Sequence, residues 1–199
     1  RQKVLYLVEL GLYHEAIVAS DSLMRHRSVK EEDFIAVAHA LRSAKQPFQV
    51  IALLEQARIY RPNSHKLKLL LAHAYHDANK PYSAGLIFES LAMNDIKYAF
   101  EAAQAFKMAK RFVRALSQNA KVPNVEKRFK QRLAILVEDG RFFEVAAMEK
   151  TLSRLGLLDD DELRYAIAYA HFKSAAAKKA KHHLNQIEDT RLLEQVSAL

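Results

Sequence analysis

Residues 31–63 read EEDFIAVAHALRSAKQPFQVIALLEQARIYRPN, and residues 65–91 read HKLKLLLAHAYHDANKPYSAGLIFESL. The two stretches align with an offset of 34 residues, which pairs Val37 with Leu71, Ala38 with Ala72, Leu41 with Tyr75, Leu54 with Phe88 and Ala57 with Leu91. Apolar residues that recur every three or four positions predict amphipathic helices. A repeat of about 34 residues is the period of stacked helical hairpins.

Glycine and proline mark the predicted ends of these helices. Pro47 and Pro81 stand where the second helix of each hairpin begins, a position at which the missing N–H is harmless and the fixed φ suits the first turn. Gly11, Gly140 and Gly156 follow apolar-periodic segments, where a helix ends with a residue in the left-handed conformation. These breakers therefore agree with the hairpin prediction.

Weaker copies of the repeat flank the central pair. We expect hairpins over residues 1–29, 30–63, 64–95, 96–124, 125–158 and 159–188, followed by a capping helix over 189–199. A hairpin cannot bury both of its apolar faces alone, whereas stacked hairpins bury them against each other. The sequence predicts an all-α fold, a right-handed α-solenoid of about six hairpins that forms one array. Gly85 lies inside a predicted helix, and we expect it to let a neighbouring helix approach closely.

The composition supports this fold class and excludes several chemistries. Half of the residues are hydrophobic, with only four Gly and four Pro, which favours helix over strand. The chain has no cysteine, so disulfides, thiolate zinc sites and cysteine nucleophiles are excluded. No apolar run approaches the roughly 18 residues that span a bilayer, and we expect a soluble domain, with the cytoplasm and the bacterial cell envelope (periplasm) both possible. Because the chain opens at Arg1 within an amphipathic pattern, we interpret it as part of a longer protein.

These residues resemble the tetratricopeptide repeat (TPR) family, whose signature places small and bulky residues at fixed points of a helical hairpin. In the second hairpin those points hold Ala38, Leu41, Val50, Leu54, Ala57 and Pro62, and in the third they hold Ala72, Tyr75, Tyr82, Ala84, Phe88 and Leu91. The family's tryptophan is absent, and the match is strongest over residues 34–91. The resemblance implies a scaffold that binds peptides or partner proteins along a concave surface lined by the first helix of each hairpin.

Three positions in each first helix would point into such a groove. The first column holds Ile35, Leu69, Phe100 and Tyr165, the second holds His39, His73, Gln104 and Tyr169, and the third holds Arg42, His76, Lys107 and Phe172. The columns predict a partly basic front half and an aromatic back half. We expect an acidic or carboxylate-bearing partner, oriented by charge-assisted hydrogen bonds from Arg42 and Lys107. The alternative is an ordinary solvated helix face. The Lys and two Asn that some family members use to hold chaperone C-termini are missing from the columns.

Neither a metal site nor a catalytic site is predicted. His39, His73 and His76 offer three imidazoles, but without a metal-binding motif such a cluster is weak support for zinc. We expect no metal and no cofactor, and we place His182 and His183 on an exposed helix. The chain has no glycine-rich phosphate loop and no nucleophile elbow, which argues against an enzyme.

Two alternative functions remain open. Apolar residues at the array ends could support self-association into a homo-oligomer, and those residues are Leu5, Val8, Leu193 and Val196. The net charge is +8, and two basic runs could instead contact nucleic acid or an anionic surface. The runs contain Lys121, Lys127, Arg128, Lys130 and Arg132, and then Arg164, Lys173, Lys178, Lys179 and Lys181.

Overall fold

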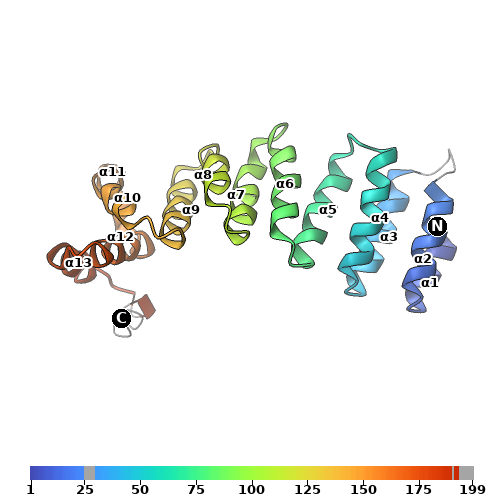
Figure 1. Cartoon of the computed structure of the whole chain (residues 1–199), viewed down its shortest axis with the longest axis horizontal. Helices are drawn as coiled ribbons and strands as arrows, with labels where there is room; N and C mark the ends of the chain where they lie inside the picture. The colour runs from blue at the N-terminus through green and yellow to red at the C-terminus, as the bar shows by residue number, and fades with distance from the viewer. Residues whose placement is uncertain (25–29, 190, 193–199) are drawn as a thin grey trace. The chain divides into compact units, whose positions relative to one another are not determined.

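The computed structural model describes residues 1–24, 30–189 and 191–192. Every regular element in these ranges is a helix, α1 to α13 with two short 3-10 helices, η1 and η2, which confirms the all-α prediction (Figure 1). None of these helices is long and apolar enough to cross a membrane. The chain divides into two compact units, Arg1–Arg111 and Phe112–Leu199. The division falls inside the predicted hairpin 96–124, and the single array over 1–199 stays a prediction.

The first unit is a stack of helical hairpins. Its elements are α1 (Gln2–Glu9), α2 (Tyr13–Met24), α3 (Glu31–Ser43), α4 (Pro47–Tyr60), α5 (His65–Asp77), α6 (Pro81–Ala92), η1 (Ile96–Tyr98) and α7 (Ala99–Met108). Consecutive helices pack as pairs, and α1 also contacts α3, α3 contacts α5, and α2 contacts α4. Contacts between equivalent helices of successive hairpins are what stacking predicts. Pro47 and Pro81 stand in the first turns of α4 and α6, as expected.

The N-terminal end of this unit corrects one expectation. Val8 is only 5% exposed, and Leu5 is half-buried against the core. Both side chains stabilise the α1–α2 hairpin, so they are not the exposed apolar surface that the self-association alternative requires. Leu193 and Val196, with most of the predicted capping helix, lie outside the described residues.

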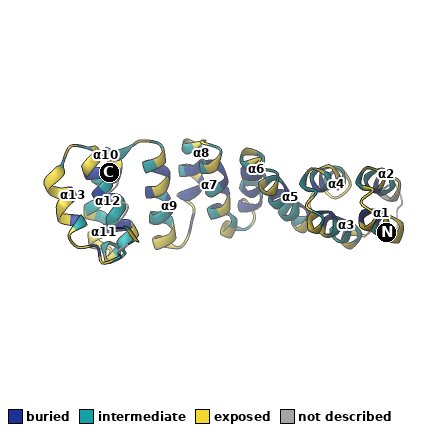
Figure 2. Ribbon diagram, turned by 90° about the horizontal axis from the view of Figure 1, so that it is seen from below, coloured by how far each residue is buried: buried dark blue, intermediate teal, exposed yellow. Residues whose placement is uncertain are grey.

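The second unit has its own core. It contains α8 (Phe112–Asn119), α9 (Val125–Glu138), α10 (Phe142–Ala147), α11 (Glu149–Arg154), η2 (Leu157–Asp159), α12 (Asp161–Lys173) and α13 (Ala177–Leu184). Helix α12 packs against α9, α10 and α13, and the core is formed by Leu133, Leu136, Val145, Leu152, Leu163, Ile167 and Ala170. In both units the helices carry buried and exposed sides (Figure 2). His182 is exposed, but His183 is only 4% exposed. The expectation that both are exposed is wrong for His183, because α13 packs that side against the unit.

One turn geometry recurs through the described chain. The backbone φ is positive at Gly11, Lys45, Asn79, Lys110, Gly140 and Ala175, which are 30 to 35 residues apart. At each of these residues the N–H donates to the carbonyl three residues back, and the next N–H donates to the carbonyl five residues back. This pair of hydrogen bonds is the Schellman motif that ends a helix. The six turns coincide with the six predicted hairpins.

Candidate functional site

The predicted groove residues of the first unit lie on α3, α5 and α7, and none of them is buried. His39, Arg42 and His76 are exposed, whereas Ile35, Leu69, His73, Phe100, Gln104 and Lys107 are half-buried. Ile35 and Leu69 pack partly against the hydrophobic core. Their surface available to a partner is therefore smaller than the sequence pattern suggested.

The third column is joined by a carboxylate. Arg42 on α3 donates from Nε to Oδ2 of Asp77 on α5, at 2.7 Å, and from Nη2 to Oδ1, at 3.4 Å. His76 Nδ1 lies 3.9 Å from the same Asp77 Oδ1. The sequence analysis assigned Arg42 to an acidic partner, but such a partner has to compete with Asp77. The predicted positive front half is therefore partly neutralised within the chain.

His73 does not add positive charge to this face. Burial, followed by the nearby Arg42 guanidinium, lowers its pKa below the usual 6.5, although Asp77 acts in the opposite direction. Its ring meets the buried Phe88 ring edge-on, with centroids 5.7 Å apart. His73 is thus a neutral, half-buried packing residue at neutral pH. It also does not belong to the one group in the described chain whose His, Asp or Glu atoms are close enough to share a metal ion.

In the second unit, α9 and α12 form an apolar groove of about 240 Å³. It is lined by Lys130, Leu133, Ala134, Val137, Glu162, Leu163, Tyr165, Ala166 and Tyr169. Two predicted residues, Tyr165 and Tyr169, stack with their centroids 6.4 Å apart, and burial raises the pKa of Tyr165. The third, Phe172, is 49% exposed and is not part of the lining.

The groove contains residues that the sequence analysis left out. Lys130, Ala134 and Val137 on α9 have the same spacing of four and then three residues as each set of column positions. Val137 also precedes its left-handed turn residue, Gly140, by three positions, as Arg42 precedes Lys45. The signal was therefore present in the sequence, but the fifth hairpin was not included in the columns.

Acidic and polar partners compensate part of the two basic runs. Lys130 Nζ lies 2.5 Å from Oδ2 of Asp160, and Arg164 donates a hydrogen bond to Gln186. The hydrogen bond with Asp160 raises the pKa of Lys130, and burial offsets this effect only in part. Binding of nucleic acid or of an anionic surface stays a prediction for the exposed lysines of α12 and α13.

Stacked hairpins closed by Schellman turns define an all-α helical-repeat protein. No protein-family model matches the chain, and no curated protein matches it. Two solved structures are similar: MamA MSR-1 C2, at 19% identity and a TM-score of 0.58 over 82% of this chain and 96% of the other, and TTC0263, a thermophilic TPR protein of Thermus thermophilus, at 16% identity and a TM-score of 0.50 over 85% and 98%. At these identities the likeness speaks to the fold, and the fold is TPR-like.

Proposed function

We propose that the chain is a protein-interaction scaffold, and that its second unit binds a segment of a partner protein in the α9–α12 groove. The observation that carries this proposal is the groove itself, an apolar trough lined by Tyr165 and Tyr169. Clefts that are mostly apolar with a few polar groups are typical binding sites. Tyrosines offer large contact areas with little conformational entropy to lose.

The size of the groove favours a peptide side chain as its occupant. Pockets for small molecules usually measure about 300–1,000 Å³, and this groove is smaller, at about 240 Å³. An aliphatic or aromatic anchor residue of a partner fits that volume. Lys173 Nζ lies 5.2 Å from the centroid of Tyr169 and 5.8 Å from that of Phe172. This positive charge favours a partner that carries an acidic residue beside the anchor.

A peptide library tests the proposal. Peptides selected on the intact chain should be enriched in an apolar anchor next to Asp or Glu. Ala134 is an exposed residue of the groove wall, so Ala134→Trp should fill the groove and weaken the selected peptides at least about tenfold, as loss of a central anchor does. Ala147→Trp, at an exposed residue of α10, is the matched control. Equal binding to both variants would discard the groove.

The α3–α5–α7 face is a second candidate surface of the same scaffold. Arg42 and Asp77 supply a direct test, because Asp77→Asn releases the Arg42 guanidinium from its ion pair. If an acidic partner binds here, Asp77→Asn should strengthen binding and Arg42→Gln should weaken it. Lys107→Gln should act in the same direction as Arg42→Gln. Unchanged binding in all three variants would remove this face from the proposal.

A further inference from the structure

Three side chains from three separate helices of the second unit meet at one point. Glu149 begins α11, His171 lies in the last turn of α12, and His183 lies near the end of α13. Nε2 of His171 is 2.8 Å from Oε2 of Glu149. Nε2 of His183 is 3.2 Å from the other carboxylate oxygen, Oε1. One potential ligand atom from each residue lies within 4.8 Å of those of the other two.

This cluster is buried and incompletely hydrogen-bonded. His171 and His183 are each 4% exposed, and their rings are nearly parallel, with centroids 5.8 Å apart. Among the described residues, neither ring nitrogen of His183 has a hydrogen-bond partner. Its Nε2 is close to Glu149 but poorly aligned for a hydrogen bond. A buried polar atom without a partner is unusual in a folded protein, and one explanation is an absent ion.

The protonation states suit a cation. Burial lowers the pKa of His183, and the Glu149 carboxylate offsets that effect only in part. Burial alone would raise the pKa of Glu149, but the hydrogen bond from His171 and the proximity of His183 hold it below its usual value. A neutral imidazole and an ionised carboxylate are the forms that bind metal ions.

We propose that Glu149, His171 and His183 form a binding site for a divalent transition-metal ion, with Zn²⁺ as the best match. Zinc binds nitrogen and oxygen ligands at about 2.0–2.2 Å in tetrahedral geometry, which separates the ligand atoms by roughly 3.3 Å. The separations of 2.8 and 3.2 Å from Glu149 are close to that value. Two imidazoles and one carboxylate form a known zinc donor set, whereas Ca²⁺ and Mg²⁺ prefer oxygen ligands alone.

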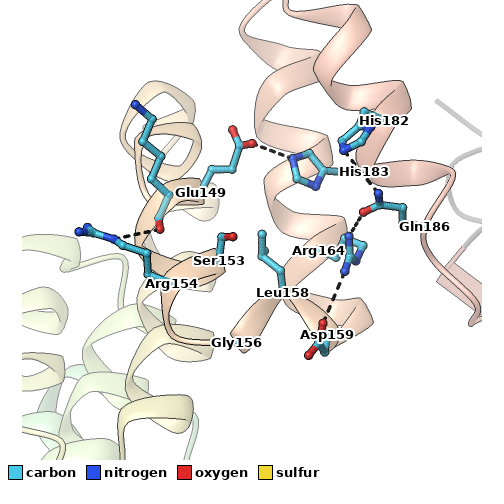
Figure 3. A pocket seen from close by; sticks show the side chains of 11 residues that line it. Glu149, Ser153, Arg154, Gly156, Leu158, Asp159, Arg164, His182, His183 and Gln186 are labelled. Atoms are coloured by element: carbon cyan, nitrogen blue, oxygen red, sulfur yellow. Dashed lines mark hydrogen bonds and ion pairs between the residues drawn. The ribbon is translucent and has the colours of Figure 1, made fainter.

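A pocket gives access to the cluster and leaves one coordination position for solvent. It measures about 730 Å³, and Glu149 and His183 belong to its wall (Figure 3). Lys150, Ser153, Arg154, Gly156, Leu158, Asp159, Arg164, His182 and Gln186 complete the lining. Three protein ligands with a fourth, open position form a recurrent zinc arrangement. Water can supply the fourth ligand here.

The test measures Zn²⁺ and Co²⁺ binding to the untagged full chain after chelator treatment and dialysis. We expect one tightly bound Zn²⁺ per chain and a Co²⁺ spectrum typical of tetrahedral coordination. Loss of an outer-shell partner already lowers metal affinity about 10- to 100-fold, so Glu149→Gln and His183→Gln should each lower it by roughly 100-fold or more. His182→Gln is the matched control, because His182 is the neighbouring histidine but is exposed.

Three outcomes would overturn the site. These are no Zn²⁺ binding by the folded wild-type chain, an octahedral Co²⁺ spectrum, or binding that survives Glu149→Gln but is lost in His182→Gln. Circular dichroism verifies that each variant is helical. If a variant does not fold, the Co²⁺ spectrum of the wild-type chain decides the question. A rise in melting temperature with Zn²⁺ in the wild type, absent in Glu149→Gln, supports the site independently.

Discussion

Gly85 of α6 lies directly against the ring of Phe106 of α7. A Cβ atom on Gly85 would stand 2.8 Å from two carbons of that ring, well inside van der Waals contact. Phe106 is completely buried, so its ring cannot move without displacing the residues around it. This contact confirms the expectation that Gly85 allows a neighbouring helix to approach closely, and it explains a glycine in the middle of a helix.

Gly85→Ala should therefore destabilise the first unit. Alanine gains about 1 kcal/mol of helix propensity over glycine, but overpacking a well-packed core costs about 1–3 kcal/mol. We expect a net loss of about 1–2 kcal/mol, measured by urea unfolding. In a Phe106→Leu background the same substitution should be neutral or stabilising. Additive effects of the two substitutions would show that the contact is not the cause.

The left-handed turn residues predict opposite effects at two equivalent positions. An added Cβ at Gly140 meets no atom within 4 Å, so Gly140→Ala tests the backbone alone and should cost about 1 kcal/mol. Ala175 adopts φ +59° in the equivalent turn, and Ala175→Gly should stabilise the second unit by up to about 1 kcal/mol. Thermal unfolding measures both variants. A fall in melting temperature for Ala175→Gly contradicts the prediction.

Asp160 should make the second unit sensitive to acid. Its Oδ1 accepts hydrogen bonds from the N–H groups of Glu162 and Leu163, at 3.0 and 3.1 Å, and Lys130 contacts its Oδ2. Burial would raise the pKa of Asp160, but these interactions outweigh burial and hold it below its usual value. A folded-state pKa below the unfolded value of about 3.9 stabilises the fold fully above that pH and progressively less as the pH falls through the folded-state pKa.

The test compares Asp160→Ala with the wild type between pH 7 and pH 2. At pH 7 the substitution should lower stability by about 1–2 kcal/mol, since it removes a helix N-cap. The difference should shrink below pH 4 because the wild-type carboxyl also loses its charge. Asp159→Ala is the control, as the Asp159 side chain is 93% exposed. A pH-independent difference would assign the loss to something other than the carboxylate.

Asn119 should be important for the packing of α8 on α9. It is fully buried and donates from Nδ2 to the Arg128 carbonyl, at 2.9 Å, and to Gln131 Oε1, at 3.1 Å. Asn119→Ala removes the donor and should cost about 1–3 kcal/mol. Ser117→Ala changes an exposed residue of the same helix and should stay within about 0.5 kcal/mol. Chemical denaturation distinguishes the two, and equal losses would reject the role of Asn119.

The repeat period, the helices and their breakers could be read from the amino-acid sequence. Pro47 and Pro81 begin helices, and Gly11 and Gly140 end them, because each of these effects depends on the backbone freedom of one residue and its nearest neighbours. Apolar spacing likewise identifies the buried side of each helix. Lys45, Lys110 and Ala175 adopt the same turn without glycine, and only the repeat spacing indicated them.

Interactions between helices were decided by the tertiary structure. The pairing of Arg42 with Asp77 and the meeting of Glu149 with His171 and His183 join residues on different helices, at sequence separations that match no local motif. Side-chain rotamers and the approach of packed helices determine which of many polar residues come within hydrogen-bonding distance. The sequence alone thus determined where helices form and which sides they bury, while packing in three dimensions chose the charge partners, the groove walls and the buried histidines.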